Sequence, residues 1–235
     1  MRVVILGVGR LGGSLVPLLR DAGVDAVPWS RGAPVPPDAD VYWVTVRDSA
    51  VAEVAARLPA RAVALHAAGA HGPDLLGERP ERGVLHPLMT FPGPAVGLPD
   101  LRGVGARVDG TPGAVRHATA LAERLGLRPF RVPGDTAAYH AAAALASGHL
   151  SALFLDSARV LARAGVPMED APALLLPLAL ESLKRAAEAG AAALTGPAAR
   201  GDVATEQRHR AVLADEEASI YAALADRIRR LRGGA

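Results

Sequence analysis

The sequence contains no cysteine among its 235 residues, which excludes disulfides, thiolate metal ligands and a cysteine nucleophile. Its seven histidines show no H-E-x-x-H or comparable spacing, so we expect no metal site. Basic and acidic residues nearly balance, at 26 and 24, and are spread along the chain, so no nucleic-acid partner is indicated. The chain also lacks a cationic leader and a hydrophobic run long enough to span a bilayer, so we expect a cytoplasmic protein without a membrane partner.

Hydrophobic residues make up 50% of the chain, enough for one large domain or two smaller ones. Up to residue 133, short β-branched runs alternate with stretches of helical period, a pattern that predicts a parallel sheet with crossover helices. A stretch rich in proline and glycine, from 71 to 101, predicts mostly loops. The predicted strands are 2–6, 25–29, 41–46, 62–66, 83–85, 103–108 and 127–132, and the predicted helices are 11–22, 49–57 and 112–125.

Three glycines form the pattern G-x-G-x-x-G between the first predicted strand and the first predicted helix. In this context the first glycine permits a tight turn, the second lets the backbone approach a pyrophosphate, and the third lets the helix pack closely on the strand. The amides at the helix N-terminus face the anion. We therefore predict a dinucleotide site rather than a glycine-rich turn without a ligand. The predicted contacts are Gly7, Gly9, Arg10, Leu11, Gly12, Val46 and His66.

The end of the second predicted strand distinguishes between the two nicotinamide cofactors. An NAD site usually has an acidic residue there, which binds the ribose hydroxyls, whereas an NADP site needs a cation and small donors. This strand ends in Trp29, Ser30 and Arg31, and Asp25 lies at its start. A serine hydroxyl and a guanidinium suit a 2′-phosphate, so NADP is favoured, although Arg31 can also be read as an ordinary solvated arginine.

Beyond residue 133 no strand signal returns, and helix-forming residues dominate. Asp135 and Thr136 are candidate N-caps of a helix of nearly thirty residues that ends at Gly165. Two more helical stretches are predicted at 169–189 and 202–232, the first of them broken or kinked by Pro172 and Pro177.

This change of pattern predicts two domains. The first, 1–133, is expected to be an α/β Rossmann domain with a mainly parallel, doubly wound sheet that binds the cofactor. The second, 134–235, is expected to be an all-α domain that binds substrate and forms a dimer.

Six motifs are distributed along the chain: GxGxxGxS at 7–14, TVRDSAV at 45–51, LHAAGAHG at 65–72, LHPLMTFP at 85–92, YHAAAALASGHLSAL at 139–153 and ALTGPAARGD at 193–202. Together they resemble a bacterial family of Rossmann-like proteins with a C-terminal domain of unknown function. That family belongs to the 6-phosphogluconate dehydrogenase-like superfamily, beside pyrroline-5-carboxylate reductase, prephenate dehydrogenase and ketopantoate reductase. The resemblance covers nearly the whole chain and implies an NAD(P)-dependent oxidoreductase with a small-molecule substrate.

The chain departs from the family pattern at two places. Where members commonly read HTSGA, this chain has Ala68 in place of the serine, so a hydroxyl expected near the nicotinamide is missing. Where members commonly read SNHL, this chain has Gly148 in place of the asparagine that helps to position substrate in related reductases. Either the substrate differs, or another group performs these tasks.

Hydride transfer requires a proton donor, or a base in the reverse direction, beside the reacting carbon. His86 follows the fifth predicted strand, at the edge where α/β sheets bind ligands. On the long helix, His140 and Ser147 lie two turns apart on one face, which is expected to close the cleft. These three residues are the predicted catalytic groups. The alternatives are a half-buried histidine at the domain junction for His140 and a loop-ordering role for His86.

A turn leading into the last predicted helix contains Thr195, Arg200 and Asp202, with His209 downstream. Asp202 is a credible N-cap, which explains this residue without any ligand. Threonine, arginine and histidine near a helix N-terminus also suit a carboxylate or phosphate. Thr195, Arg200 and His209 are therefore the predicted substrate-binding residues.

Two functions remain open. The first is an NADP-dependent oxidoreductase that transfers hydride between NADPH and a small carbonyl or imine compound, such as a 2-keto acid of the ketopantoate type. The second is a nucleotide-binding sensor or regulatory protein that has lost turnover. In either case, the long Ala/Leu faces at 141–155 and 174–183 predict a homodimer through the helical domain, as in related reductases.

Overall fold

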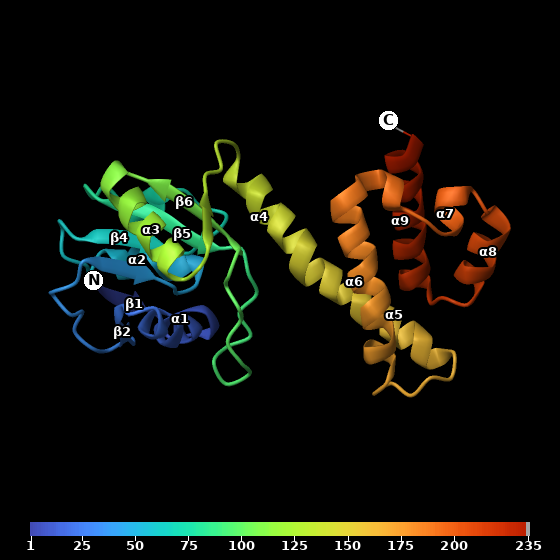
Figure 1. The fold of residues 1–235 in the computed structure, drawn as a ribbon, viewed down its shortest axis with the longest axis horizontal. Coiled ribbons are helices and arrows are strands. Elements are labelled where there is room, and N and C mark those ends of the chain that lie inside the picture. Colours follow the sequence, from blue (N-terminus) through green and yellow to red (C-terminus); the bar gives the residue numbers. More distant parts are fainter. Residues whose placement is uncertain (234–235) are drawn as a thin grey trace. The chain divides into compact units, whose positions relative to one another are not determined.

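The computed structural model describes residues 1–233, which form two compact units, Met1–Ser147 and a second unit that begins at Gly148 (Figure 1). The first contains the sheet and the second is helical. The boundary predicted at residue 133, where the sequence pattern changes, stays a prediction. The helices are α1 (Arg10–Asp21), α2 (Val51–Ala55), α3 (Pro112–Arg124), α4 (Thr136–Ala144), α5 (Leu150–Arg163), α6 (Ala171–Ala189), α7 (Pro197–Arg200), α8 (Val203–Ala211) and α9 (Asp215–Gly233).

The sheet has seven strands in the order β2-β1-β3-β4-β5-β6-β7. Every neighbouring pair is parallel except β5 and β6, which are antiparallel. This arrangement confirms the predicted α/β Rossmann fold with a mainly parallel sheet, followed by a helical region. The strands are β1 (Arg2–Leu6), β2 (Asp25–Trp29), β3 (Val41–Val44), β4 (Val63–His66), β5 (Arg82–Pro87), β6 (Gly105–Gly110) and β7 (Arg128–Phe130).

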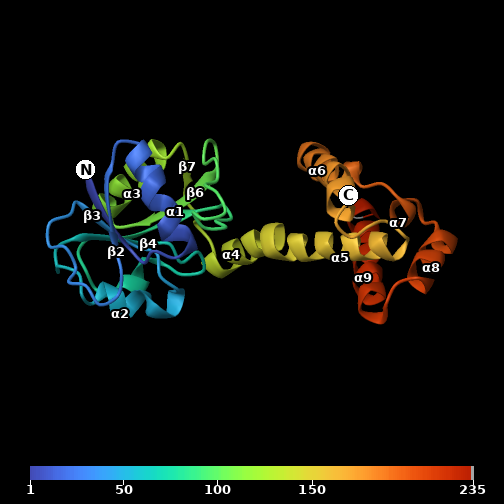
Figure 2. The same cartoon turned by 90° about the horizontal axis from the view of Figure 1, so that it is seen from below.

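Strand β1 shows why the sheet is covered on both faces. Val3 and Ile5 pack in one core with residues of α1 and α3, whereas Val4 and Leu6 pack in a second core with residues of α2. Figure 2 shows α1 and α3 on one side of the sheet and α2 on the other. Because successive side chains of a strand point to opposite faces, a doubly covered strand reads as a continuous aliphatic run.

The strand order reverses at β1, because β2 lies on one side of it and β3 on the other. Such a reversal leaves a crevice at the carboxyl ends of the two strands, where open α/β sheets bind ligands. Gly7 follows β1, Ser30 follows β2 and Thr45 follows β3. The glycine motif and the predicted cofactor-selecting residues therefore lie at the same edge of the sheet.

The chain is helical from Thr136 to Arg163, with a π-helical turn at Leu145–His149 between α4 and α5. Asp135 caps this stretch by accepting a hydrogen bond of 2.7 Å from the backbone N–H of Ala137. The predicted long helix and its cap are confirmed. In the second unit, Asp202 caps α8 by accepting from the N–H of Thr205 at 3.0 Å, as predicted.

The structure answers one prediction for the helical region in part and shows another to be wrong. Of the break or kink predicted at Pro172 and Pro177, the break does not occur, because Pro172 lies in the first turn of α6, where no N–H donor is needed, and Pro177 is accommodated within the helix. A kink stays a prediction. The single helix predicted at 202–232 is two helices, α8 and α9. The second begins anew because the Glu217 carboxylate accepts a hydrogen bond of 3.0 Å from the N–H of Ala214, just ahead of α9.

Candidate functional site

The glycine turn after β1 is held closely against its neighbours. Gly7 has a φ of +112°, a conformation that favours glycine, and its carbonyl accepts a hydrogen bond of 2.7 Å from the Thr45 hydroxyl. A Cβ at Gly12 would collide with the Gly7 carbonyl oxygen and lie 2.5 Å from Oγ1 of Thr45. These two glycines are therefore needed for the approach of α1 to β1 and β3.

Gly9 differs from its two neighbours because it faces open space. A Cβ at Gly9 would meet no heavy atom within 4 Å in the described part of the chain. Gly9 is also the N-cap of α1 and provides no side-chain acceptor to the amides of the first helical turn. The turn thus combines an open approach with unclaimed N–H donors, a combination that fits a pyrophosphate.

A cavity of about 330 Å³ opens beside this turn. Ser30 and Arg31, which follow β2, line one part of it, and their contact with a cofactor stays a prediction. Arg57, which follows α2, also lines it and pairs with Glu53 at 2.8 Å. Arg57 was missed by sequence reasoning because only the strand order places the end of α2 beside β2. The lining is completed by Gly7, Val8, Gly9, Trp29, Val46, Glu53 and Val54.

The other predicted cofactor residues do not line this cavity. Arg10, Leu11 and Gly12 form the first turn of α1, so their predicted contacts are through backbone amides. His66 is fully buried, and both of its ring nitrogens are occupied. Its Nδ1 accepts from the N–H of Ala68 at 3.1 Å and its Nε2 donates to the Gly72 carbonyl at 2.9 Å, so the ring orders the loop after β4.

A second group of residues meets on the loop after β4, around Gly69. His86 at the end of β5 forms a hydrogen bond of 2.7 Å between Nδ1 and the hydroxyl of Tyr139 on α4. The rings of His86 and His140 are 6.1 Å apart between centroids. A Cβ at Gly69 would lie 2.6 Å from Cδ2 of His140 and 2.9 Å from Nε2 of His86. The structure thus brings two of the predicted catalytic residues together, with Tyr139 as a third partner.

Burial lowers the pKa of His86 to about 4, and the charges of His140 and Arg107 add to this effect. The imidazole is therefore neutral near pH 7, with one nitrogen that donates and one that accepts. Burial also raises the pKa of the Tyr139 phenol above its usual value of about 10, with Arg107 opposing the shift. Both groups of this hydrogen bond are neutral under physiological conditions.

Arg107 on β6 contacts the loop that contains Gly69 and also the Tyr139 ring, and it was not predicted from the sequence. Its side chain is fully buried, and its Nη1 donates to the carbonyls of Gly69 and His71, both at 3.0 Å. Its Nη2 pairs with Asp109 at 3.2 Å, and its Cζ lies 5.7 Å from the centroid of the Tyr139 ring. A buried arginine of this kind is rarely predicted from sequence, because arginine is usually exposed.

Ser147, the third predicted catalytic residue, lies in the π-helical turn and is exposed. Its hydroxyl donates a hydrogen bond of 2.7 Å to the carbonyl of Ala143 on its own helix. The structure does not bring this hydroxyl into the group around Gly69, and a catalytic role for Ser147 stays a prediction.

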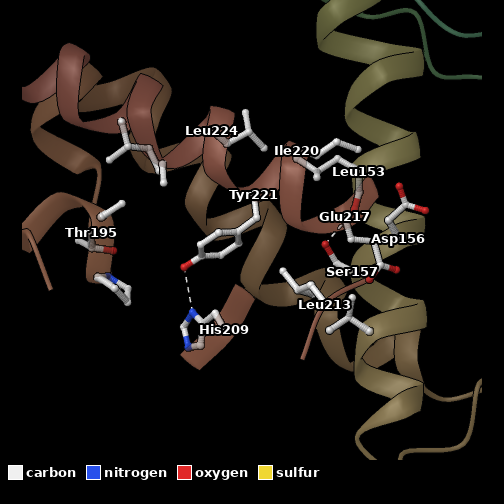
Figure 3. A pocket seen from close by; sticks show the side chains of 15 residues that line it. Leu153, Asp156, Ser157, Thr195, His209, Leu213, Glu217, Ile220, Tyr221 and Leu224 are labelled. Carbon is white, nitrogen blue, oxygen red and sulfur yellow. Dashed lines mark hydrogen bonds between the residues drawn. The ribbon is translucent and has the colours of Figure 1, made fainter. Parts of the chain in front are cut away.

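The helical unit has a cavity of its own, of about 420 Å³ and mostly apolar (Figure 3). Thr195 and His209, two predicted substrate-binding residues, line it, and Nδ1 of His209 lies 2.9 Å from the hydroxyl of Tyr221. Arg200, the third, is exposed at the end of α7 and is not among the lining residues. Substrate binding by this set stays a prediction.

Residues 1–233 contain neither a metal-binding cluster nor a membrane-spanning helix. No group of three or more histidine, aspartate or glutamate side chains in this range is arranged to hold a metal ion. No helix in the same range has both the length and the apolar character of a membrane span.

The fold and the glycine turn together define a protein with a Rossmann-type unit and a second, helical unit. The chain belongs to the family of the domain of unknown function DUF2520, whose model matches residues 105–228. This match confirms the family resemblance of the sequence motifs. No curated protein matches the chain by sequence.

Several solved structures share this fold at low sequence identity. A candidate NADP oxidoreductase from Bacteroides fragilis is 24% identical, with 97% of this chain and 98% of that chain covered and a TM-score of 0.82. A 1-pyrroline-5-carboxylate reductase from Streptococcus pyogenes is 13% identical, with 98% and 99% covered and a TM-score of 0.67. A reductive aminase from Aspergillus terreus, in complex with NADPH4, cyclohexanone and allyl amine, is 17% identical, with 99% and 95% covered and a TM-score of 0.68. At these identities the likeness shows the fold.

Proposed function

We propose that this protein is an NADP-dependent oxidoreductase that transfers hydride between NADPH and a small carbonyl or imine substrate. The observation that carries the proposal is the cavity in which the open glycine turn meets Ser30, Arg31 and Arg57. The glycine turn suits a pyrophosphate, and two guanidinium groups beside a hydroxyl suit the 2′-phosphate of NADP. Proteins with the same fold, among them a candidate NADP oxidoreductase and two reductive enzymes, support the assignment.

When bound, the reduced nicotinamide supplies the hydride, and the chain must supply a proton or a hydrogen bond to the atom that gains negative charge. His86 and His140, both next to Gly69, are the groups we assign to this task. We propose that these two histidines perform the tasks of the serine hydroxyl and the asparagine amide that family members have at the positions of Ala68 and Gly148. One candidate substrate is a 2-keto acid of the ketopantoate type. Substrate binding by Thr195, Arg200 and His209, which lie in the helical unit, stays a prediction.

The proposal predicts that NADPH binds at least about tenfold more tightly than NADH, or roughly 1.4 kcal/mol, a difference that one charge-assisted phosphate contact can provide. Calorimetric titration measures both affinities, and a panel of 2-keto acids and cyclic imines tests for oxidation of NADPH. Arg31→Ala is expected to remove most of the preference while leaving NADH binding nearly unchanged. Arg57→Ala is expected to act in the same direction.

Arg61→Ala is the matched control, because Arg61 is exposed and does not line the cavity. Equal or tighter binding of NADH by the wild-type protein would contradict the assignment of NADP. Tight binding of NADPH without turnover of any compound in the panel would instead favour a nucleotide sensor.

We also propose that the protein is a homodimer through its helical unit. Five leucines on α6 expose between 46% and 66% of their surface, a large apolar area that a partner is expected to cover. Because a two-fold interface uses the same surface twice, Leu178→Glu is expected to convert the dimer into monomers. The leucines are Leu174, Leu176, Leu178, Leu180 and Leu183.

Light scattering should report a mass near twice 24.1 kDa for the wild-type protein and near 24.1 kDa for Leu178→Glu. Val96→Glu is the control, since Val96 is 77% exposed on a loop of the sheet unit. A wild-type monomer at micromolar concentration would refute the assembly.

A further inference from the structure

The hydrogen bond between Tyr139 and His86 has a direction that follows from the state of its two groups. Both are neutral near pH 7, because burial lowers the pKa of His86 to about 4 and raises that of Tyr139. A phenolic O–H is a much stronger acid than the N–H of a neutral imidazole, so the phenol donates and Nδ1 accepts. The ring proton of His86 is then on Nε2.

Nε2 of His86 is the ring nitrogen that has no hydrogen-bond partner within the described chain, whereas Nδ1 is occupied by the Tyr139 hydroxyl at 2.7 Å. Nε2 lies where only a glycine at position 69 leaves room, since a Cβ there would be 2.9 Å away. The N–H at Nε2 of His86 is therefore a donor left free within the described residues, and the Tyr139 hydroxyl is bonded to the other ring nitrogen, Nδ1.

Arg107 favours ionisation of Tyr139. Its guanidinium lies 5.7 Å from the centroid of the Tyr139 ring, and its charge stabilises a phenolate more than a phenol. Hydrogen bonds to the carbonyls of Gly69 and His71 hold the guanidinium in place. Because the side chain is fully buried, solvent screens its charge only weakly, and the Asp109 carboxylate at 3.2 Å offsets part of that charge.

We propose that Tyr139 is the proton source of a relay that runs through His86 to the substrate. The inference rests on the proposed reduction of a carbonyl or imine. As the substrate oxygen or nitrogen gains charge, it takes the proton from Nε2 of His86, and Nδ1 takes the proton of the Tyr139 hydroxyl. The N–H bond at Nε2 and the phenolic O–H bond break, while a new bond to hydrogen forms on the substrate and another on Nδ1.

His86 stays neutral throughout and changes only its tautomer, and Tyr139 becomes a phenolate beside Arg107. After product leaves, Nε2 takes a proton from water, which leaves hydroxide, and Nδ1 returns its proton to the phenolate, so that each reduction consumes one proton from solvent. Other charged and titratable groups around His86 are His140 on α4, His66 on β4 and Asp48 in the turn Asp48–Ala50, besides Arg107 on β6. Asp48 alone favours a protonated ring, and burial outweighs it.

The tautomer can be tested without cofactor or substrate. A long-range ¹H–¹⁵N spectrum distinguishes imidazoles protonated on Nδ1 from those protonated on Nε2, and loss of one signal in His86→Gln assigns His86. We expect the Nε2–H form in the wild-type protein and a mixture of tautomers in Tyr139→Phe, which keeps the ring and removes only the hydroxyl. A wild-type His86 protonated on Nδ1 would overturn the relay.

The relay also predicts how Tyr139→Phe changes kcat and its solvent isotope effect. Tyr139→Phe should lower kcat by about 100-fold, the scale of a lost proton donor, with the affinity for NADPH unchanged. In mixtures of H₂O and D₂O, wild-type kcat should follow a curve for two protons in motion, and Tyr139→Phe a line for one. Tyr42→Phe is the control, because the Tyr42 hydroxyl bonds only to the carbonyls of Pro36 and Pro37 in the described residues.

The possible failures are distinguishable. A wild-type protein that oxidises NADPH with unchanged kcat in Tyr139→Phe would overturn the relay and leave the proposed function intact. A wild-type protein with no turnover would overturn the proposed function and the relay with it. The tautomer measurement still reports whether Tyr139 donates to His86.

Discussion

Replacing Gly9 with valine is expected to leave the protein folded while lowering its affinity for NADPH by at least about 100-fold, or roughly 2.7 kcal/mol. A Cβ at Gly9 would meet no heavy atom within 4 Å in residues 1–233, so the substitution is expected to cost little in the protein alone. The same open space is where a pyrophosphate must approach the backbone. A branched side chain would fill it and separate the phosphates from the first-turn amides of α1. Calorimetric titration of NADPH measures the loss, and circular dichroism checks the fold.

Gly12→Ala is the informative contrast to Gly9→Val. Here the added Cβ would collide with the Gly7 carbonyl and lie 2.5 Å from Oγ1 of Thr45, so α1 must move away from the sheet. Overpacking of this kind typically costs about 1–3 kcal/mol, which should lower the melting temperature. If Gly9→Val binds NADPH as tightly as the wild type, the glycine motif is only a turn. If Gly9→Val has as low a melting temperature as Gly12→Ala, then position 9 has no more room for a side chain than position 12.

Gly69→Ala is expected to reduce kcat/KM by about 100-fold, the scale that a misplacement of about 1 Å can cost a catalytic group. Its Cβ would lie 2.6 Å from His140 and 2.9 Å from Nε2 of His86, closer than real Cβ atoms approach other atoms. Both rings must move, and the bond between His86 and Tyr139 must lengthen or break. Because Gly69 is outside the nucleotide cavity, the affinity for NADPH should not change.

Gly72→Ala provides the matched control on the same loop. A Cβ at Gly72 would meet nothing within 4 Å among the described residues, and its φ of −83° suits alanine. This variant should keep wild-type activity. Steady-state kinetics of the two variants, with calorimetry for NADPH, separates catalysis from binding. Full activity in Gly69→Ala would show that the group around Gly69 does not perform the chemistry.

Much of the sheet unit was predictable from sequence, because the signals are local. The aliphatic run before Gly7 indicates a strand buried on both faces, and the spacing to Gly9 and Gly12 indicates a strand-turn-helix unit. Ser30 and Arg31 were found because their distance along the chain from the glycine motif is fixed by one βαβ unit. Asp135 and Asp202 were found because capping depends on neighbouring residues only.

The break before α9 was missed even though its signal is local. The Glu217 carboxylate accepts a hydrogen bond from the N–H of Ala214, three residues earlier, and a new helix begins where helix propensity alone predicts one continuous helix. The sequence left open whether proline breaks or kinks α6, because an interior proline can do either. The structure shows a continuous helix of 19 residues with Pro177 inside it.

By itself, the sequence determined the order of the elements, the glycine turn and the two residues after β2, all of which depend on contacts within one βαβ unit. Only the tertiary structure decided what surrounds them. Arg57 reaches the cavity because β3 and α2 return beside β1. The Tyr139 hydroxyl bonds to His86 although the two residues are 53 positions apart in the sequence, and Arg107 is buried next to them. Such meetings depend on strand order and burial, which no local pattern of residues specifies.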